Sequence, residues 1–197
     1  MGKNILIIFL IISIKCACGQ DQNVSALWIK ATPSVGNQFA KYSSESTSFR
    51  LQYRKAVFKD FLAGGGVERT EFRLSTALPH HIKALTLFIQ GGYKHKLDPK
   101  VDLIGLVYVG YSFLDYSLEQ SVTYLRGSKQ SAPAAGVSLS MILPLSKHVS
   151  FQPEIGYAMI LHKLNGFTTT DPMKYPEENS DASFGFWAYR IGLGYNF

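Results

Sequence analysis

The chain has 197 residues, of which 46% are hydrophobic and 13% aromatic, and its formal net charge is +6. This length indicates one domain, and the modest basic excess lacks the clustered stripe that nucleic-acid binding requires. We therefore expect no nucleic-acid partner. No run of 18 apolar residues occurs after residue 19, so any membrane-spanning segments must be strands.

Residues 1–19 have the pattern of a secretory signal peptide. Lys3 precedes the apolar run 5–12, and Ala17-Cys18-Gly19 provides small residues at the cleavage site. The run is too short for a membrane-anchoring helix, which needs about 20 residues. A lipoprotein is the alternative, but Lys15 stands where a lipobox requires small or aliphatic residues. We expect the mature chain to begin near Gln20.

Both cysteines of the chain, Cys16 and Cys18, lie in this leader. The mature protein is therefore expected to have no disulfide, no thiolate metal site and no cysteine nucleophile.

Residues 20–46 form an N-terminal segment before the main strand pattern. Within it, residues 25–32 have a strand-like pattern. Three interpretations of residues 24–33 stay open: a barrel strand, a periplasmic extension or an insert in the lumen.

Residues 47–197 contain a succession of strand patterns. The predicted strands are 49–57, 61–72, 85–93, 103–113, 116–124, 137–143, 149–161 and 185–197. In the last two, apolar residues alternate strictly with small or polar ones such as Glu154 and Arg190, a period of two typical of a strand between lipid and lumen. The pattern predicts an all-β, antiparallel up-and-down transmembrane barrel. Eight strands are favoured and ten are the alternative.

The connections between these strands differ in length. Turns are expected near Leu114-Asp115 and across residues 144–148, a loop contains Asp98-Pro99, and residues 58–61 resemble a short periplasmic turn. Residues 162–184 form the longest predicted loop. Because long loops of such barrels face outward, this loop should be extracellular and could contact an extracellular partner.

Several motifs of the chain are similar to those of one known protein family. They are the leader, the aromatic C-terminus, residues 150–157 (Ser-Phe-Gln-Pro-Glu-Ile-Gly-Tyr) and residues 61–66 (Phe-Leu-Ala-Gly-Gly-Gly). The chain resembles small Gram-negative outer-membrane proteins of the porin-like β-barrel family, with OmpA- and OmpX-type architecture. The resemblance implies an integral outer-membrane location, outer-membrane lipids as partners, and an assembly signal at Tyr195 and Phe197 for the insertion machinery.

The inward faces of the predicted strands collect charged side chains. The predicted lumen charge network consists of Arg50, Arg54, Glu68, Glu119, Glu154 and Arg190. An eight-stranded barrel has an interior that side chains fill, and an unpaired buried charge costs several kcal/mol. These groups are therefore expected to pair as a structural plug.

No residue pattern predicts catalysis, a cofactor or a metal. His148 has Ser150 two residues later but lies in a predicted turn. Adjacent side chains such as His80 and His81 point opposite ways in a strand, and Gly64-Gly65-Gly66 lacks the Lys-Ser/Thr of a phosphate loop.

We predict a non-enzymatic outer-membrane barrel with a filled lumen and a structural or surface-interaction role through its extracellular loops. One alternative is a small passive porin, which needs ten or more strands or a mobile network. The other is a soluble, secreted ligand-binding barrel, which would require apolar residues at Gln152, Glu154 and Arg190.

Overall fold

A computed structural model describes residues 22–29, 31–33, 43–74, 80–118, 125–127, 129–161, 167–169 and 184–197. In these ranges the chain forms strands and no helix. The strands are β1 (Gln22–Ile29), β2 (Ala31–Pro33), β3 (Ser43–Phe58), β4 (Phe61–Leu74), β5 (His80–Asp98), β6 (Val101–Leu118), β7 (Leu125–Gly127), β8 (Lys129–Pro144), β9 (Val149–Ile160), β10 (Phe167–Thr169) and β11 (Phe184–Asn196).

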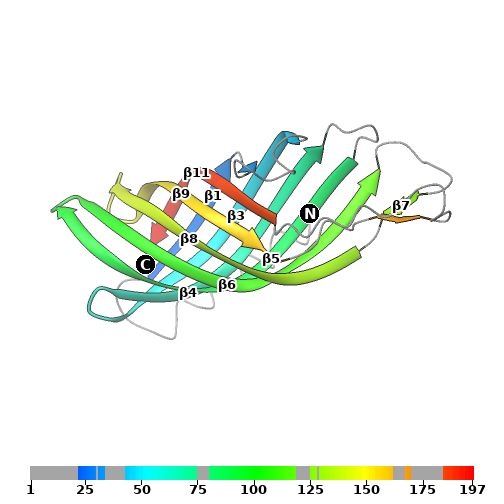
Figure 1. Ribbon diagram of the computed structural model, residues 1–197. Helices are drawn as coiled ribbons and strands as arrows, with labels where there is room; N and C mark the ends of the chain where they lie inside the picture. Colours follow the sequence, from blue (N-terminus) through cyan, green and yellow to red (C-terminus); the bar gives the residue numbers. More distant parts are fainter. Residues whose placement is uncertain are drawn as a thin grey trace, which may run out of the picture.

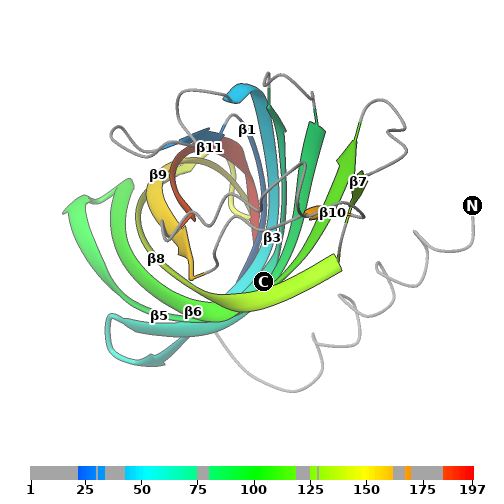
Figure 2. The same ribbon diagram turned by 45° about the vertical axis from the view of Figure 1, so that its right-hand side comes forward.

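Eight wall elements close into a barrel. The order is β1, β3, β4, β5, β6, β8, β9 and β11, and each is antiparallel to the next. The last strand returns to the first, with a register from Asn23 opposite Asn196 to Trp28 opposite Ile191. β2 pairs farther along β11, so β1 and β2 form one wall element (Figure 2). The predicted eight-stranded up-and-down antiparallel barrel is confirmed.

The set of eight strands differs from the predicted set at two places. Residues 24–33 are neither a periplasmic extension nor a lumen insert, because β1 pairs with both β3 and β11. The barrel wall therefore starts before residue 47. The separate strand at residues 116–124 and the turn near Leu114-Asp115 are wrong, since β6 runs unbroken to Leu118. Residues 119–124 lie outside the described residues.

The physical reason for the second error lies in the alternation of β6. Leu114 and Tyr116 are buried inside the barrel, and Asp115 between them is an exposed outward residue. Asp115 occupies an ordinary outward position of the strand, and the pleat continues through it where the turn is predicted.

The two ends of the barrel differ in their connections (Figure 1). At one end, here called the turn end, tight turns at residues 59–60, 99–100 and 145–148 join β3 to β4, β5 to β6 and β8 to β9. The predicted hairpin across residues 144–148 is confirmed, with the amide of Leu145 donating to the carbonyl of Val149 at 2.8 Å. Lys59 adopts the left-handed backbone conformation that such a short turn requires (φ 47°).

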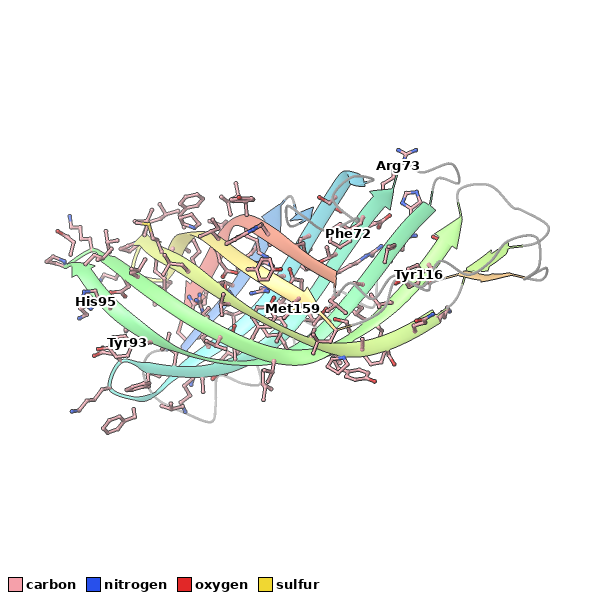
Figure 3. All side chains as sticks on the ribbon, viewed as in Figure 1. Phe72, Arg73, Tyr93, His95, Tyr116 and Met159 are labelled. Atoms are coloured by element: carbon pink, nitrogen blue, oxygen red, sulfur yellow. The ribbon has the colours of Figure 1, made fainter. Side chains whose placement is uncertain are left out.

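At the opposite end, here called the loop end, β7 pairs with β10 as a small separate sheet (Figure 1). Within the predicted loop at 162–184, residues 162–166 and 170–183 lie outside the described residues. The C-terminus lies at the turn end, where the side chains of Tyr93 and His95 also lie, while Phe72 and Tyr116 lie toward the loop end (Figures 1 and 3).

The wall is apolar outside and polar inside at mid-height. On β5, Leu87 and Ile89 are 51% and 69% exposed, whereas Thr86 and Gln90 are buried. Other outward residues are Phe49, Phe61, Val107, Val109, Phe113, Val137, Leu139, Ile155, Trp187, Tyr189, Ile191 and Leu193. Buried inward ones include Ser48, Arg50, Gln52, Arg54, Glu68, Ser140, Gln152, Glu154 and Arg190. This arrangement is the opposite of the one that a soluble ligand-binding barrel requires.

The outward apolar face has the height of a bilayer. On β5 it extends from Leu85 to Tyr93, in keeping with the roughly 9–11 residues that a tilted strand needs to cross. Lys83 and His95 stand just beyond its two limits. At the turn end the rings of Phe61 and Tyr93 lie 5.3 Å apart, edge to face, as expected of an aromatic girdle.

We predict that Ile89→Lys destabilises the folded barrel by about 2–4 kcal/mol, because it places a charge at the middle of the apolar face. Leu97→Lys is the matched control on the same strand, four residues beyond Tyr93, and should cost about 0–1 kcal/mol. Reversible urea unfolding in lipid vesicles measures both. Equal costs for the two variants would contradict the assigned bilayer position.

Candidate functional site in the barrel lumen

Four charged side chains meet at the centre of the lumen. The strand register places Arg50 of β3 directly opposite Glu68 of β4, and Arg190 of β11 directly opposite Glu154 of β9. Arg50 Nη2 lies 2.6 Å from Glu68 Oε2, and Arg190 Nη1 lies 2.9 Å from Glu154 Oε1. Each pair therefore follows from the pairing of two neighbouring strands.

Two further contacts join these pairs across the lumen. Arg50 Nη1 donates to Glu154 Oε1 at 3.1 Å, and Arg190 Nη2 donates to Glu68 Oε1. Each carboxylate thus faces both guanidinium groups. The four side chains are almost completely buried, with at most 4% of any residue exposed. Removing one member would leave a buried charge with fewer partners, which is strongly destabilising.

Neighbouring groups add further contacts to this cluster. Ser48 Oγ donates to Glu68 Oε1 at 2.7 Å. The guanidinium of Arg50 also lies over the rings of Phe88 and Tyr108, 4.9 Å and 4.7 Å from their centroids. These cation–π contacts fix the arginine from a third side and fill the space beside the ion pairs.

Arg54 lies on β3 two inward positions closer to the turn end than Arg50, and it has different hydrogen-bond partners. Its Nη2 donates to Gln152 Oε1 at 2.6 Å and to Asn23 Oδ1 at 3.0 Å. Gly194 makes room for this layer, because a Cβ at that position would collide with the amide of Gln152. Arg54 Nη2 also lies 3.5 Å from Ser25 Oγ. Among the described residues, the acceptors for this guanidinium group are therefore amide and hydroxyl oxygens, not a carboxylate.

Apolar layers lie on both sides of the polar centre. Toward the loop end, inward residues form a buried cluster that includes Phe72, Ile82, Leu114, Tyr116, Ile160 and Phe186. The rings of Phe72 and Phe186 lie 5.1 Å apart, edge to face. Toward the turn end, Leu62, Ile104 and Leu106 form a second cluster. The sequence interpretation missed both layers, although the apolar character of both faces of residues 103–113 was the available signal.

The structure brings five of the six predicted lumen charges inside the barrel: Arg50, Arg54, Glu68, Glu154 and Arg190. Glu119 lies outside the described residues.

The predicted assembly signal lies at the turn end of β11. The rings of Tyr195 and Phe197 are 5.0 Å apart, and the amide of Phe197 donates to the carbonyl of Gln22 at 3.1 Å. Recognition of these two residues by the insertion machinery stays a prediction.

Two of the histidines considered as candidates for chemistry, His148 and His81, contact neighbouring residues of the barrel wall. His148 stacks on Tyr195 with centroids 5.7 Å apart, and its Nδ1 lies 3.2 Å from the carbonyl oxygen of Asn196. His81 Nδ1 lies 3.3 Å from Glu71 Oε1. Within the described ranges, no three His, Cys, Asp or Glu side chains are grouped to hold a metal ion. The same ranges contain no helix long and apolar enough to span a membrane.

No protein-family model matches the chain, and no curated protein matches it. Several solved structures do. Neisserial surface protein A has 16% identity and a TM-score of 0.59, with 91% of this chain and 100% of that chain covered. The outer membrane protein OprG from Pseudomonas aeruginosa has 15% identity and a TM-score of 0.59, with 91% and 96% covered.

A third similar structure is Ail, the attachment invasion locus protein of Yersinia pestis, in complex with the heparin analogue sucrose octasulfate. It has 13% identity and a TM-score of 0.55, with 91% of this chain and all of that chain covered. Identities this low establish shared architecture alone. The chain has the closed, eight-stranded antiparallel fold of small outer-membrane β-barrels.

Proposed function

We propose that this protein is an integral outer-membrane barrel with a sealed lumen that acts as a scaffold for its surface loops, without catalysis. The outward apolar face supports the membrane location, as do the similar outer-membrane structures. The surface role is an inference from the sequence, in which residues 162–184 form the longest loop. The similarity to an attachment protein of Yersinia pestis is in keeping with it.

The observation that carries the sealed lumen is the network of Arg50, Glu68, Glu154 and Arg190. Its contacts link β3, β4, β9 and β11, so they cross the lumen as well as following the wall. Each member is almost entirely buried, and apolar layers lie above and below. An ion would have to displace several charge-assisted hydrogen bonds to pass, which favours a plug over an open pore.

We predict that Glu68→Gln destabilises the barrel by about 3–5 kcal/mol, because Arg50 and Arg190 would then share one buried carboxylate. The matched control is Glu71→Gln on the same strand, whose carboxylate contacts Arg69 at 3.6 Å and His81 at 3.3 Å on the outer face. Its cost should be about 0–1 kcal/mol. Urea unfolding in vesicles measures both values, and a similar cost for both would refute a stabilising network inside the lumen.

We further predict that the mature chain, refolded in a planar bilayer, shows no steady single-channel conductance. A heat-modifiability gel on the same sample establishes that the barrel has formed. Steady conduction by a folded barrel would overturn the sealed-lumen proposal and favour the small passive porin. A silent, folded barrel supports the scaffold role.

A further inference from the structure

A groove of about 640 Å³ lies on the outer face of the wall at the loop end, away from the lumen network. It extends over β4, β5, β6 and β8. The residues that matter for its chemistry are Arg69, Lys83, Leu85, Phe113, Asp115 and Lys129. None of them takes part in the lumen contacts described above.

The strand register arranges these residues in two adjacent rows. One row crosses β5, β6 and β8 as Lys83, Asp115 and Lys129. The next row toward the turn end crosses β4, β5 and β6 as Arg69, Leu85 and Phe113. The groove therefore has two lysines in its outer row, and Arg69 stands beside two apolar side chains in the next row.

The cations of the groove are available to an anion. Lys83 and Lys129 form no ion pair within 4.0 Å with any described residue, although Asp115 stands between them in the register. Arg69 has a side chain that is 64% exposed and lies 3.6 Å from Glu71. The groove lining therefore has three cations and the carboxylate of Asp115, and Glu71 borders it opposite Lys83 in the register. Three positive charges against two negative ones leave a local excess of one positive charge.

The height of the groove matches the edge of the bilayer. Leu85 is the first residue of the outward apolar face on β5, and Lys83 stands just beyond it. The opposite wall differs at this end, because the outward residues of β9 and β11 are uncharged and include Tyr157, Trp187 and Tyr189. Among the outward wall residues that the structure describes at this end, the positive charge therefore lies on one side of the barrel.

We propose that this groove binds the phosphate-bearing headgroup of an outer-leaflet glycolipid, with an acyl chain against Leu85 and Phe113. A guanidinium and two ammonium groups suit a sugar phosphate, and the adjoining apolar row suits the chain of the same molecule. A free phosphate would leave the apolar row unused. The inference rests on the outer-membrane location in the proposed function, in which the loop end faces the outer leaflet.

The test uses the mature barrel in detergent micelles, with purified diphosphoryl lipid A as the probe and native mass spectrometry to follow the bound fraction. The variant Arg69→Ala/Lys83→Ala/Lys129→Ala should weaken binding about tenfold or more. The matched control is Lys96→Ala/Lys100→Ala/Lys147→Ala, which removes the same charge from exposed positions at the turn end. The control should bind like the unaltered protein.

Two further lipids test whether the groove recognises the phosphates of a glycolipid or those of any phospholipid. Lipid A without its phosphates should bind about tenfold more weakly to the unaltered protein, and phosphatidylglycerol should show a similarly weak interaction. Equal binding of phosphatidylglycerol would overturn the assignment to a glycolipid, and an equal loss in the control variant would overturn the assignment to the groove.

Folding of every variant is checked by heat modifiability, and Arg69→Lys/Lys83→Arg/Lys129→Arg should retain binding because it keeps the three charges. A folded groove variant that binds lipid A as well as the unaltered protein refutes this inference and leaves the sealed scaffold untouched. If neither the unaltered protein nor any variant forms a heat-modifiable barrel, the proposed function itself is refuted.

Discussion

Closure of the backbone hydrogen-bond ladder is the constraint on which the rest of this structure depends. Inside a bilayer no water satisfies a free amide or carbonyl group, so a spanning sheet cannot keep an open edge. Here the seam between β1 and β11 removes that edge. Once eight wall elements close, the circumference is fixed and the lumen is only wide enough for side chains to fill it. The inward residues must then satisfy one another.

The lumen is filled in layers. Near mid-height, the register sets an arginine opposite a glutamate twice, on β3 with β4 and on β9 with β11, and the narrow interior brings the two pairs into contact. Aromatic and aliphatic side chains fill the remaining height. The same alternation that directs these groups inward places apolar side chains on the outer face. One periodic pattern therefore produces both the packing of the interior and the apolar exterior.

The strands that could be predicted from the sequence are those in which apolar and polar residues alternate clearly. Residues 149–161 and 185–197 alternate strictly, and both the barrel and the identities of their inward charges were predictable from them. β6 is apolar on both faces because its inward residues belong to the two apolar layers, so the period of two that would show its full length is weak. The contact of Arg50 with Glu154 joins residues 104 apart in the chain. Such a contact depends on barrel curvature, and the outer groove likewise depends on the register of four strands.

The seam between β1 and β11 also has a consequence for how the chain folds. The side chains of Asn23 and Asn196, which hydrogen-bond at 2.7 Å, are 173 residues apart in the sequence. Contacts this distant in sequence carry a large loop-closure entropy and slow the search for the native state. β1 cannot pair with its second neighbour until β11 has been synthesised. Until then the free edge of β1 can pair with other chains, so the unclosed chain requires protection from aggregation.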